Sequence, residues 1–162
     1  MNEEILDHGI TNLTPGDDAK ARRLLYENKE HRKRIRNGRI LLGILAALTI
    51  VSILVTVNRY QNTIFAEQIL RNVYIQGGII FFGFIGALFY SFSNPKEAFI
   101  LGLVLYIGNH LYAFYLGATI SIFAIFLKVI IVIWFIATIR ASMLKEKNDK
   151  FISSLGLDPT IK

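Results

Sequence analysis

The stretch that decides the fold is residues 98–139, AFILGLVLYIGNHLYAFYLGATISIFAIFLKVIIVIWFIATI. These 42 residues carry a single charge, that of Lys128. As one α-helix the stretch would be roughly 63 Å long, about twice the roughly 30 Å hydrocarbon core of a bilayer. It therefore has to fold back, and residues 116–119, which include Gly117, are the natural place for a turn. The stretch predicts two antiparallel membrane spans, at residues 98–116 and 119–139.

Two further uncharged segments lie nearer the N-terminus. Residues 40–57 (ILLGILAALTIVSILVTV) form an 18-residue run, and residues 72–95 form a 24-residue run. Both are long enough to cross a bilayer as helices and are apolar on every side. Prolines occur only at positions 15, 95 and 159, outside the spans. The sequence thus predicts an all-α integral membrane protein, a four-transmembrane-helix bundle with spans at about 40–58, 73–92, 98–116 and 119–139.

The composition supports this class and excludes others. The chain has 162 residues, of which 53% are hydrophobic and 19% are charged, and its mean hydropathy is +0.45. Such a chain is neither disordered nor of ordinary soluble composition. Because it contains no cysteine, we expect no disulfide scaffold, thiolate metal site or cysteine nucleophile.

The distribution of Lys and Arg predicts the orientation. Residues 20–39 hold nine basic side chains against only Glu27 and Glu30, and cytoplasmic flanks carry the excess of positive charge. We therefore expect both termini to be cytoplasmic (N-in/C-in) and the protein to lie in the cell (inner) membrane. The expected organisation is a cytoplasmic segment with a basic helix (1–39), the transmembrane domain (40–139) and a cytoplasmic tail (140–162), frayed after Lys150.

The basic helix is a candidate site for partners. Its apolar residues are too sparse for a strong amphipathic face, so we expect it to lie against anionic lipid headgroups. Docking of a protein partner is the alternative. Nucleic acid is not an expected partner, since almost no aromatic side chains are interleaved with the charges. The candidate lipid contacts are Arg32, Lys33, Arg34, Arg36 and Arg39.

Lys128 is the most unusual residue, because it lies near the expected bilayer midplane. A lysine there costs about 2.5 to 3.5 kcal/mol on insertion scales and faces the bundle interior, a cavity or a partner. Counted from Gly117, Lys128 and Tyr106 are each eleven residues down antiparallel helices. Asn109 and His110 lie one turn higher, on the same side of the helix as Tyr106. We expect these four residues to form a polar cluster, used either as glue between helices or as a site for an anionic or polar ligand.

Small residues also follow a packing pattern. Gly43 with Ala47, and Gly83 with Ala87, have the spacing that lets membrane helices approach closely. We expect them to pack within the bundle, with homo-oligomerisation as the alternative.

No enzymatic motif is present, and no Asp or Glu lies within a span. We therefore expect no catalytic residue, metal or cofactor. The first functional hypothesis is a non-enzymatic accessory or interaction subunit that binds protein or lipid partners through its helices and basic arm. The alternative is a small oligomeric transporter or channel with a polar path around Lys128. The first is favoured because the polarity is confined to one cluster that reaches neither membrane surface.

Overall fold

The computed structural model describes residues 15–62, 66–115 and 122–158, and these residues form helices and turns without a strand. The helices are α2 (Pro15–Tyr60), α3 (Ala66–Tyr90), α4 (Pro95–Tyr115) and α5 (Ile122–Ser154). All four are long and apolar enough to cross a membrane, so the all-helical bundle with four candidate spans is confirmed. The turn expected at residues 116–119, residues 1–14 and residues 159–162 lie outside the described parts of the chain.

Helix α2 joins the basic arm and the first span in one uninterrupted element. Pro15 occupies the first position, where its missing N–H costs nothing, and Asp17 and Asp18 face the positive end of the helix dipole. The polar half is supported by an i,i+4 ion pair, with Arg22 Nε 2.9 Å from Asp18 Oδ1. With 46 residues, α2 is about 69 Å long. It is therefore more than twice as long as a bilayer core is thick.

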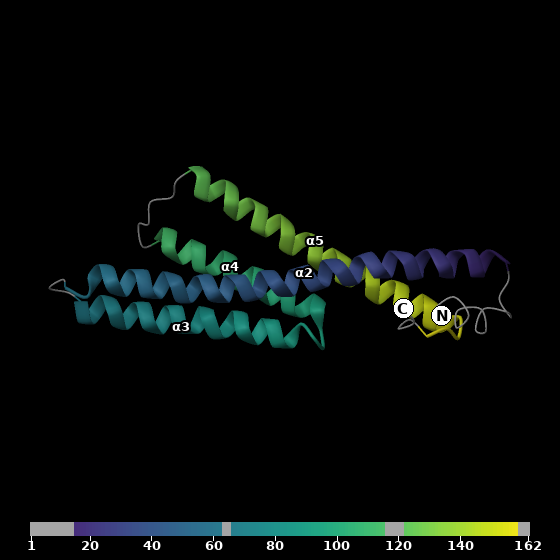
Figure 1. Cartoon of the computed structure of the whole chain (residues 1–162), viewed down its shortest axis with the longest axis horizontal. Helices are drawn as coiled ribbons and strands as arrows, with labels where there is room; N and C mark the ends of the chain where they lie inside the picture. Colours follow the sequence, from purple (N-terminus) through teal and green to yellow (C-terminus); the bar gives the residue numbers. More distant parts are fainter. Residues whose placement is uncertain (1–14, 63–65, 116–121, 159–162) are drawn as a thin grey trace.

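The four helices form an elongated bundle (Figure 1). Helix α3 returns antiparallel along the apolar half of α2, and α4 lies against α3. Helix α5 crosses α2 obliquely, so its C-terminal half lies along the basic half of α2, while its N-terminal half diverges from α2 and runs beside α4. The outward faces are apolar, with Leu54, Phe82, Val104 and Phe126 each more than 60% exposed. Such surfaces are compatible with a lipid environment.

The core lies where α2, α4 and α5 meet. Leu42, Phe99 and Phe135 are fully buried there. The approach depends on glycine: a Cβ atom at Gly102 would lie 2.7 Å from Leu42 Cδ2, and one at Gly38 would lie 2.5 Å from Thr138 Cγ2. Small residues thus allow the helices to approach closely at the crossing.

The two expected small-residue pairs differ in their packing. A Cβ atom at Gly83 would meet Leu105 Cδ1 at 2.8 Å, and Ala87 is fully buried, so this pair packs within the chain. A Cβ atom at Gly43 would meet nothing within 4 Å, and Ala47 is exposed. The Gly43 and Ala47 pair is therefore not used for packing between the described helices.

The polar halves of α2 and α5 are joined by buried amides. Asn28 is 2% exposed, and its Nδ2 donates to Asp149 Oδ1 at 2.8 Å. Asn148 Nδ2 donates to Asn28 Oδ1 at 3.1 Å, and Lys145 forms an ion pair with Asp149. We call these four residues the Asn28 junction. Beyond it, a small apolar cluster of Ala21, Ile152 and Leu157 is buried between the two helices.

The C-terminal helix extends further than the composition suggested. Instead of fraying after Lys150, α5 continues to Ser154 and ends in a Schellman motif at Gly156, whose φ is +76°. Leu157 N–H donates to Ile152 O at 3.2 Å, and Gly156 N–H donates to Ser153 O at 3.0 Å. Leu157 packs against Ile152 and Ala21, and this contact explains the difference. Because Ala21 lies more than 130 positions before the other two residues, the local composition does not predict the contact.

The turn between α3 and α4 is close to its expected position. Helix α3 ends at Tyr90, two residues before the expected end of the second span, and α4 begins at Pro95, three residues before the expected start of the third. Between them, Ser91 Oγ donates to Leu88 O at 2.6 Å, and Ala98 N–H donates to Asn94 O at 3.1 Å. These hydrogen bonds terminate one helix and begin the next.

Candidate functional site

A polar cavity of about 460 Å³ lies between the apolar halves of the four helices. Among the described residues that line it, Lys128 from α5 is the one Lys or Arg, His110 and Tyr106 are also ionisable, and none is an Asp or Glu. The other polar lining residues are Thr49, Ser52 and Thr56 from α2, Gln76 from α3 and Asn109 from α4.

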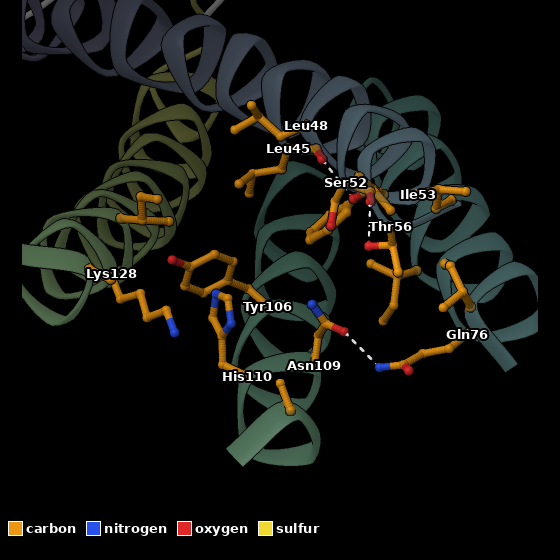
Figure 2. A pocket seen from close by; sticks show the side chains of 18 of the residues that line it. Leu45, Leu48, Ser52, Ile53, Thr56, Gln76, Tyr106, Asn109, His110 and Lys128 are labelled. Atoms are coloured by element: carbon orange, nitrogen blue, oxygen red, sulfur yellow. Dashed lines mark hydrogen bonds between the residues drawn. The ribbon is translucent and has the colours of Figure 1, made fainter. Parts of the chain in front are cut away.

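Three residues of the expected cluster face one another across the gap between α4 and α5. Figure 2 shows the Lys128 side chain extending toward His110 and Tyr106. The Tyr106 and His110 rings pack edge to face, with centroids 4.5 Å apart. Tyr106 also packs against Phe135, at 6.3 Å between centroids, which ties the cavity wall to the core. Tyr106 and Lys128 thus lie at similar depth, as their equal distances along the sequence from Gly117 predicted.

Asn109 lines the same cavity but interacts with a different helix. Its Oδ1 accepts a hydrogen bond of 3.2 Å from Gln76 Nε2 on α3, and Figure 2 shows this pair on the far side of α4 from Lys128. Asn109 therefore connects α4 to α3, while Tyr106 and His110 face α5. Gln76 was not singled out from the sequence, since it lies near the end of an otherwise apolar span.

The cavity is more extensive than the sequence suggested. Thr49, Ser52 and Thr56 follow one face of α2 at intervals of three and four residues and form a polar stripe along it. The Thr49 hydroxyl donates to Leu45 O and the Thr56 hydroxyl donates to Ser52 O, both at 2.8 Å. The sequence confined the expected polarity to one cluster, whereas this lining extends to Thr56, one helical turn before the end of α2 at Tyr60.

The opposite end of the cavity is closed. Its lining ends at Leu45, Phe84 and Ile131, which belong to or pack on the buried core that contains Leu42 and Phe135. From Leu45 to Thr56 the cavity wall is about 16 Å long at about 1.5 Å per residue. The cavity is thus a vestibule that runs from the core toward one end of the bundle.

A second cleft, of about 690 Å³, lies at the other end of the apolar region. Six basic residues line it against one acidic residue, Glu30. We call it the basic cleft. It is formed by α2, the turn after α3, the start of α4 and α5, and its basic residues are Lys29, Arg32, Lys33, Arg36, Arg39 and Lys145.

Arg39 is held in place on the wall of this cleft. One of its terminal nitrogens, Nη2, donates to Ser91 O at 2.9 Å, and its guanidinium lies over the Phe92 ring, 4.3 Å from the centroid. A planar guanidinium on an aromatic face is a favourable arrangement. Arg39 thereby joins α2 to the turn between α3 and α4, immediately before the apolar stretch that begins at Ile40.

Four of the five expected lipid contacts line the basic cleft, and the fifth does not. Arg32, Lys33, Arg36 and Arg39 are on its wall, whereas Arg34 projects from a different face of α2 and is not part of the lining. Arg34 acts on His31 instead: burial and the positive charge of Arg34 hold the pKa of His31 below its usual value. Lys145 was missed as a cleft residue because it comes from a helix more than 100 positions away.

The described residues include no group of three or more His, Asp or Glu side chains that could hold a metal ion. Comparison with protein-family models, curated proteins and solved structures finds no match for this chain.

Proposed function

We propose that the chain is a non-enzymatic integral membrane interaction protein that binds anionic lipid headgroups in its basic cleft, with both termini on the cytoplasmic side of the cell (inner) membrane. The observation that carries this proposal is the gathering of six cations around one cleft where the apolar part of α2 begins. Lipid headgroups lie at that level when the four apolar helices span the bilayer.

The charges of the cleft are only partly compensated by the protein. Lys145 is paired with Asp149, but Lys33 and Arg36 are exposed and form no ion pair with another described residue. Each basic side chain near an anionic membrane surface contributes about 1 kcal/mol of attraction. The exposed Phe92 ring at the mouth of the cleft suits the polar-apolar boundary of a bilayer.

The test compares two double variants that lose the same charge. Lys33→Gln with Arg36→Gln removes two cations from the cleft, and Arg34→Gln with Lys147→Gln removes two exposed cations outside it. Binding of phosphatidylglycerol to the purified protein is measured by native mass spectrometry. We expect the cleft variant to bind about 2 kcal/mol more weakly, roughly thirtyfold in affinity, and the control to change little. Equal losses in both variants would mean that net charge, and not the cleft, holds the lipid.

The orientation is tested separately with single cysteines in this cysteine-free chain. Asn58 and Ser153 are exposed at opposite ends of the bundle. In intact cells we expect a membrane-impermeant thiol reagent to label Asn58→Cys and to leave Ser153→Cys unlabelled. The reverse pattern would overturn the proposed orientation.

A small oligomeric transporter or channel is a second candidate, and the vestibule favours it. Its polar lining reaches one end of the bundle, and the buried core closes the other. Transport would therefore need a second conformation, or a path made by more than one copy. Monodisperse oligomers with solute flux in proteoliposomes would support this candidate. A stable complex with an unrelated larger protein would support a protein-binding accessory subunit instead.

A further inference from the structure

Lys128 carries a basic side chain that has no counterion among the described residues. Its side chain is half-buried and lines a cavity without a carboxylate. Within residues 15–62, 66–115 and 122–158, its ammonium group forms no hydrogen bond or ion pair. Since an unpaired charge at this depth is costly, an anion that entered the cavity would be stabilised by Lys128.

Two hydrogen-bonding groups lie beside this charge. The Tyr106 hydroxyl and the His110 ring, both on α4, face Lys128 on α5 (Figure 2). Neither side chain forms a hydrogen bond with another described residue. A hydroxyl and a neutral imidazole each offer one donor, so the three side chains present a set of donors suited to one acid group. Asn109 is not part of this set, because its Oδ1 accepts a hydrogen bond from Gln76 on the far side of α4.

Apart from the polar side chains named above, the described lining of the cavity is apolar, and the cavity is open at its flank. Leu48 of α2 and Leu127 of α5 both line it, and they are 54% and 50% exposed. When the apolar helices are in a bilayer, this opening faces acyl chains. A cavity of about 460 Å³ also falls within the usual range of about 300 to 1,000 Å³ for small-molecule sites. The ligand that fits has one acid group and an apolar chain.

We propose that the vestibule binds a monoanionic amphiphile, with its carboxylate or phosphodiester at Lys128, Tyr106 and His110 and its chain leaving between Leu48 and Leu127. This site is separate from the basic cleft and does not rest on the function proposed above. A carboxylate and a phosphodiester carry the same single charge, so the experiment has one arm for each.

The first measurement uses the unaltered lining of the vestibule. The full chain with Lys33→Gln and Arg36→Gln, which weaken the basic cleft, is purified in a neutral detergent. Equilibrium binding is measured for oleate and for its uncharged analogue oleyl alcohol, and in parallel for phosphatidylglycerol and phosphatidylcholine. We expect saturable binding of at least one anion, at one per chain and at least tenfold tighter than that of its partner without net charge. Equal affinity within both pairs would overturn the proposal. The pair in which the anion binds more tightly than its partner without net charge shows whether the acid group is a carboxylate or a phosphodiester.

The second measurement uses variants of Lys128 in the same background. Lys128→Met removes the charge and keeps a long side chain, Lys128→Arg keeps the charge, and Lys147→Met removes an exposed charge elsewhere. We expect at least tenfold weaker anion binding for Lys128→Met and less than threefold change for the other two. Unchanged binding by a folded Lys128→Met chain would overturn the proposal. If that variant does not fold, the comparison of charged and uncharged ligands still decides.

Discussion

Replacing Asn28 with alanine should release the C-terminal half of α5 from the basic half of α2. The substitution removes the bonds to Asp149 Oδ1, at 2.8 Å, and from Asn148 Nδ2, at 3.1 Å. A neutral hydrogen bond contributes about 1 kcal/mol and one to a charged group about 1.5 to 3 kcal/mol. Asp149 keeps its ion pair with Lys145 and is partly reached by solvent, so we expect a loss of about 2 to 3 kcal/mol.

Hydrogen exchange measured by mass spectrometry on the protein in nanodiscs tests this loss. Two to three kcal/mol corresponds to roughly 30- to 150-fold faster exchange for amides that exchange by opening of the junction. The increase should be confined to peptides from residues 18–32 and 143–157. Asn37→Ala is the matched control, since Asn37 is half-buried on the same helix and its side chain makes no hydrogen bond among the described residues. A change below threefold in Asn28→Ala, or an equal change in Asn37→Ala, would refute the reasoning.

Three further perturbations probe other parts of the fold. Gly38→Leu should lower the free energy of unfolding by about 1 to 3 kcal/mol, because even its Cβ atom would lie 2.5 Å from Thr138 Cγ2. Its control, Gly43→Leu, meets open space. We expect the control to change the thermal unfolding temperature in detergent little. The pKa of His31 is held below its unfolded value by burial and Arg34, so the unfolded chain binds more protons just below pH 6.5. Stability should therefore fall as the pH is lowered through that window, and the difference in unfolding temperature between pH 7.5 and pH 5 should be smaller in His31→Gln. Gly156→Ala forces a side chain into a φ of +76°, which costs about 1 kcal/mol and should raise hydrogen exchange only in the last two turns of α5.

The number and approximate limits of the spans were predictable because they depend on local composition. Ile40 to Val57 is apolar at nearly every position, and a bilayer requires that of any helix that crosses it. The neighbours of Lys128 were also predictable, since α4 and α5 follow each other in the chain and lie antiparallel, which sets the depth of Tyr106. The first inference uses local composition, and the second uses the packing of helices that are consecutive in the sequence.

The junction between α2 and α5 could not be predicted in this way. Asn28 and Asn148 are ordinary polar residues in charged segments, and only the crossing of the two helices brings them together. The same holds for Lys145 in the basic cleft. Thr49, Ser52 and Thr56 are a different case, because their spacing already places them on one face of a helix. In the structure, Thr49 and Thr56 donate to backbone carbonyls of their own helix, as isolated polar residues in membrane helices also do.

Helix α5 contributes to both candidate sites, but its two halves are constrained very differently. Thr138, at the crossing with Gly38, is about 15 Å from Lys128 and about 10 Å from Lys145 along the helix axis. On the C-terminal side of Thr138, the helix is fixed to α2 by the Asn28 junction and by buried Ile152. On the N-terminal side, its residues are mostly exposed, and it diverges from α2. Adjustment of the cavity to a ligand can therefore occur in the N-terminal half of α5, while the basic cleft keeps its geometry.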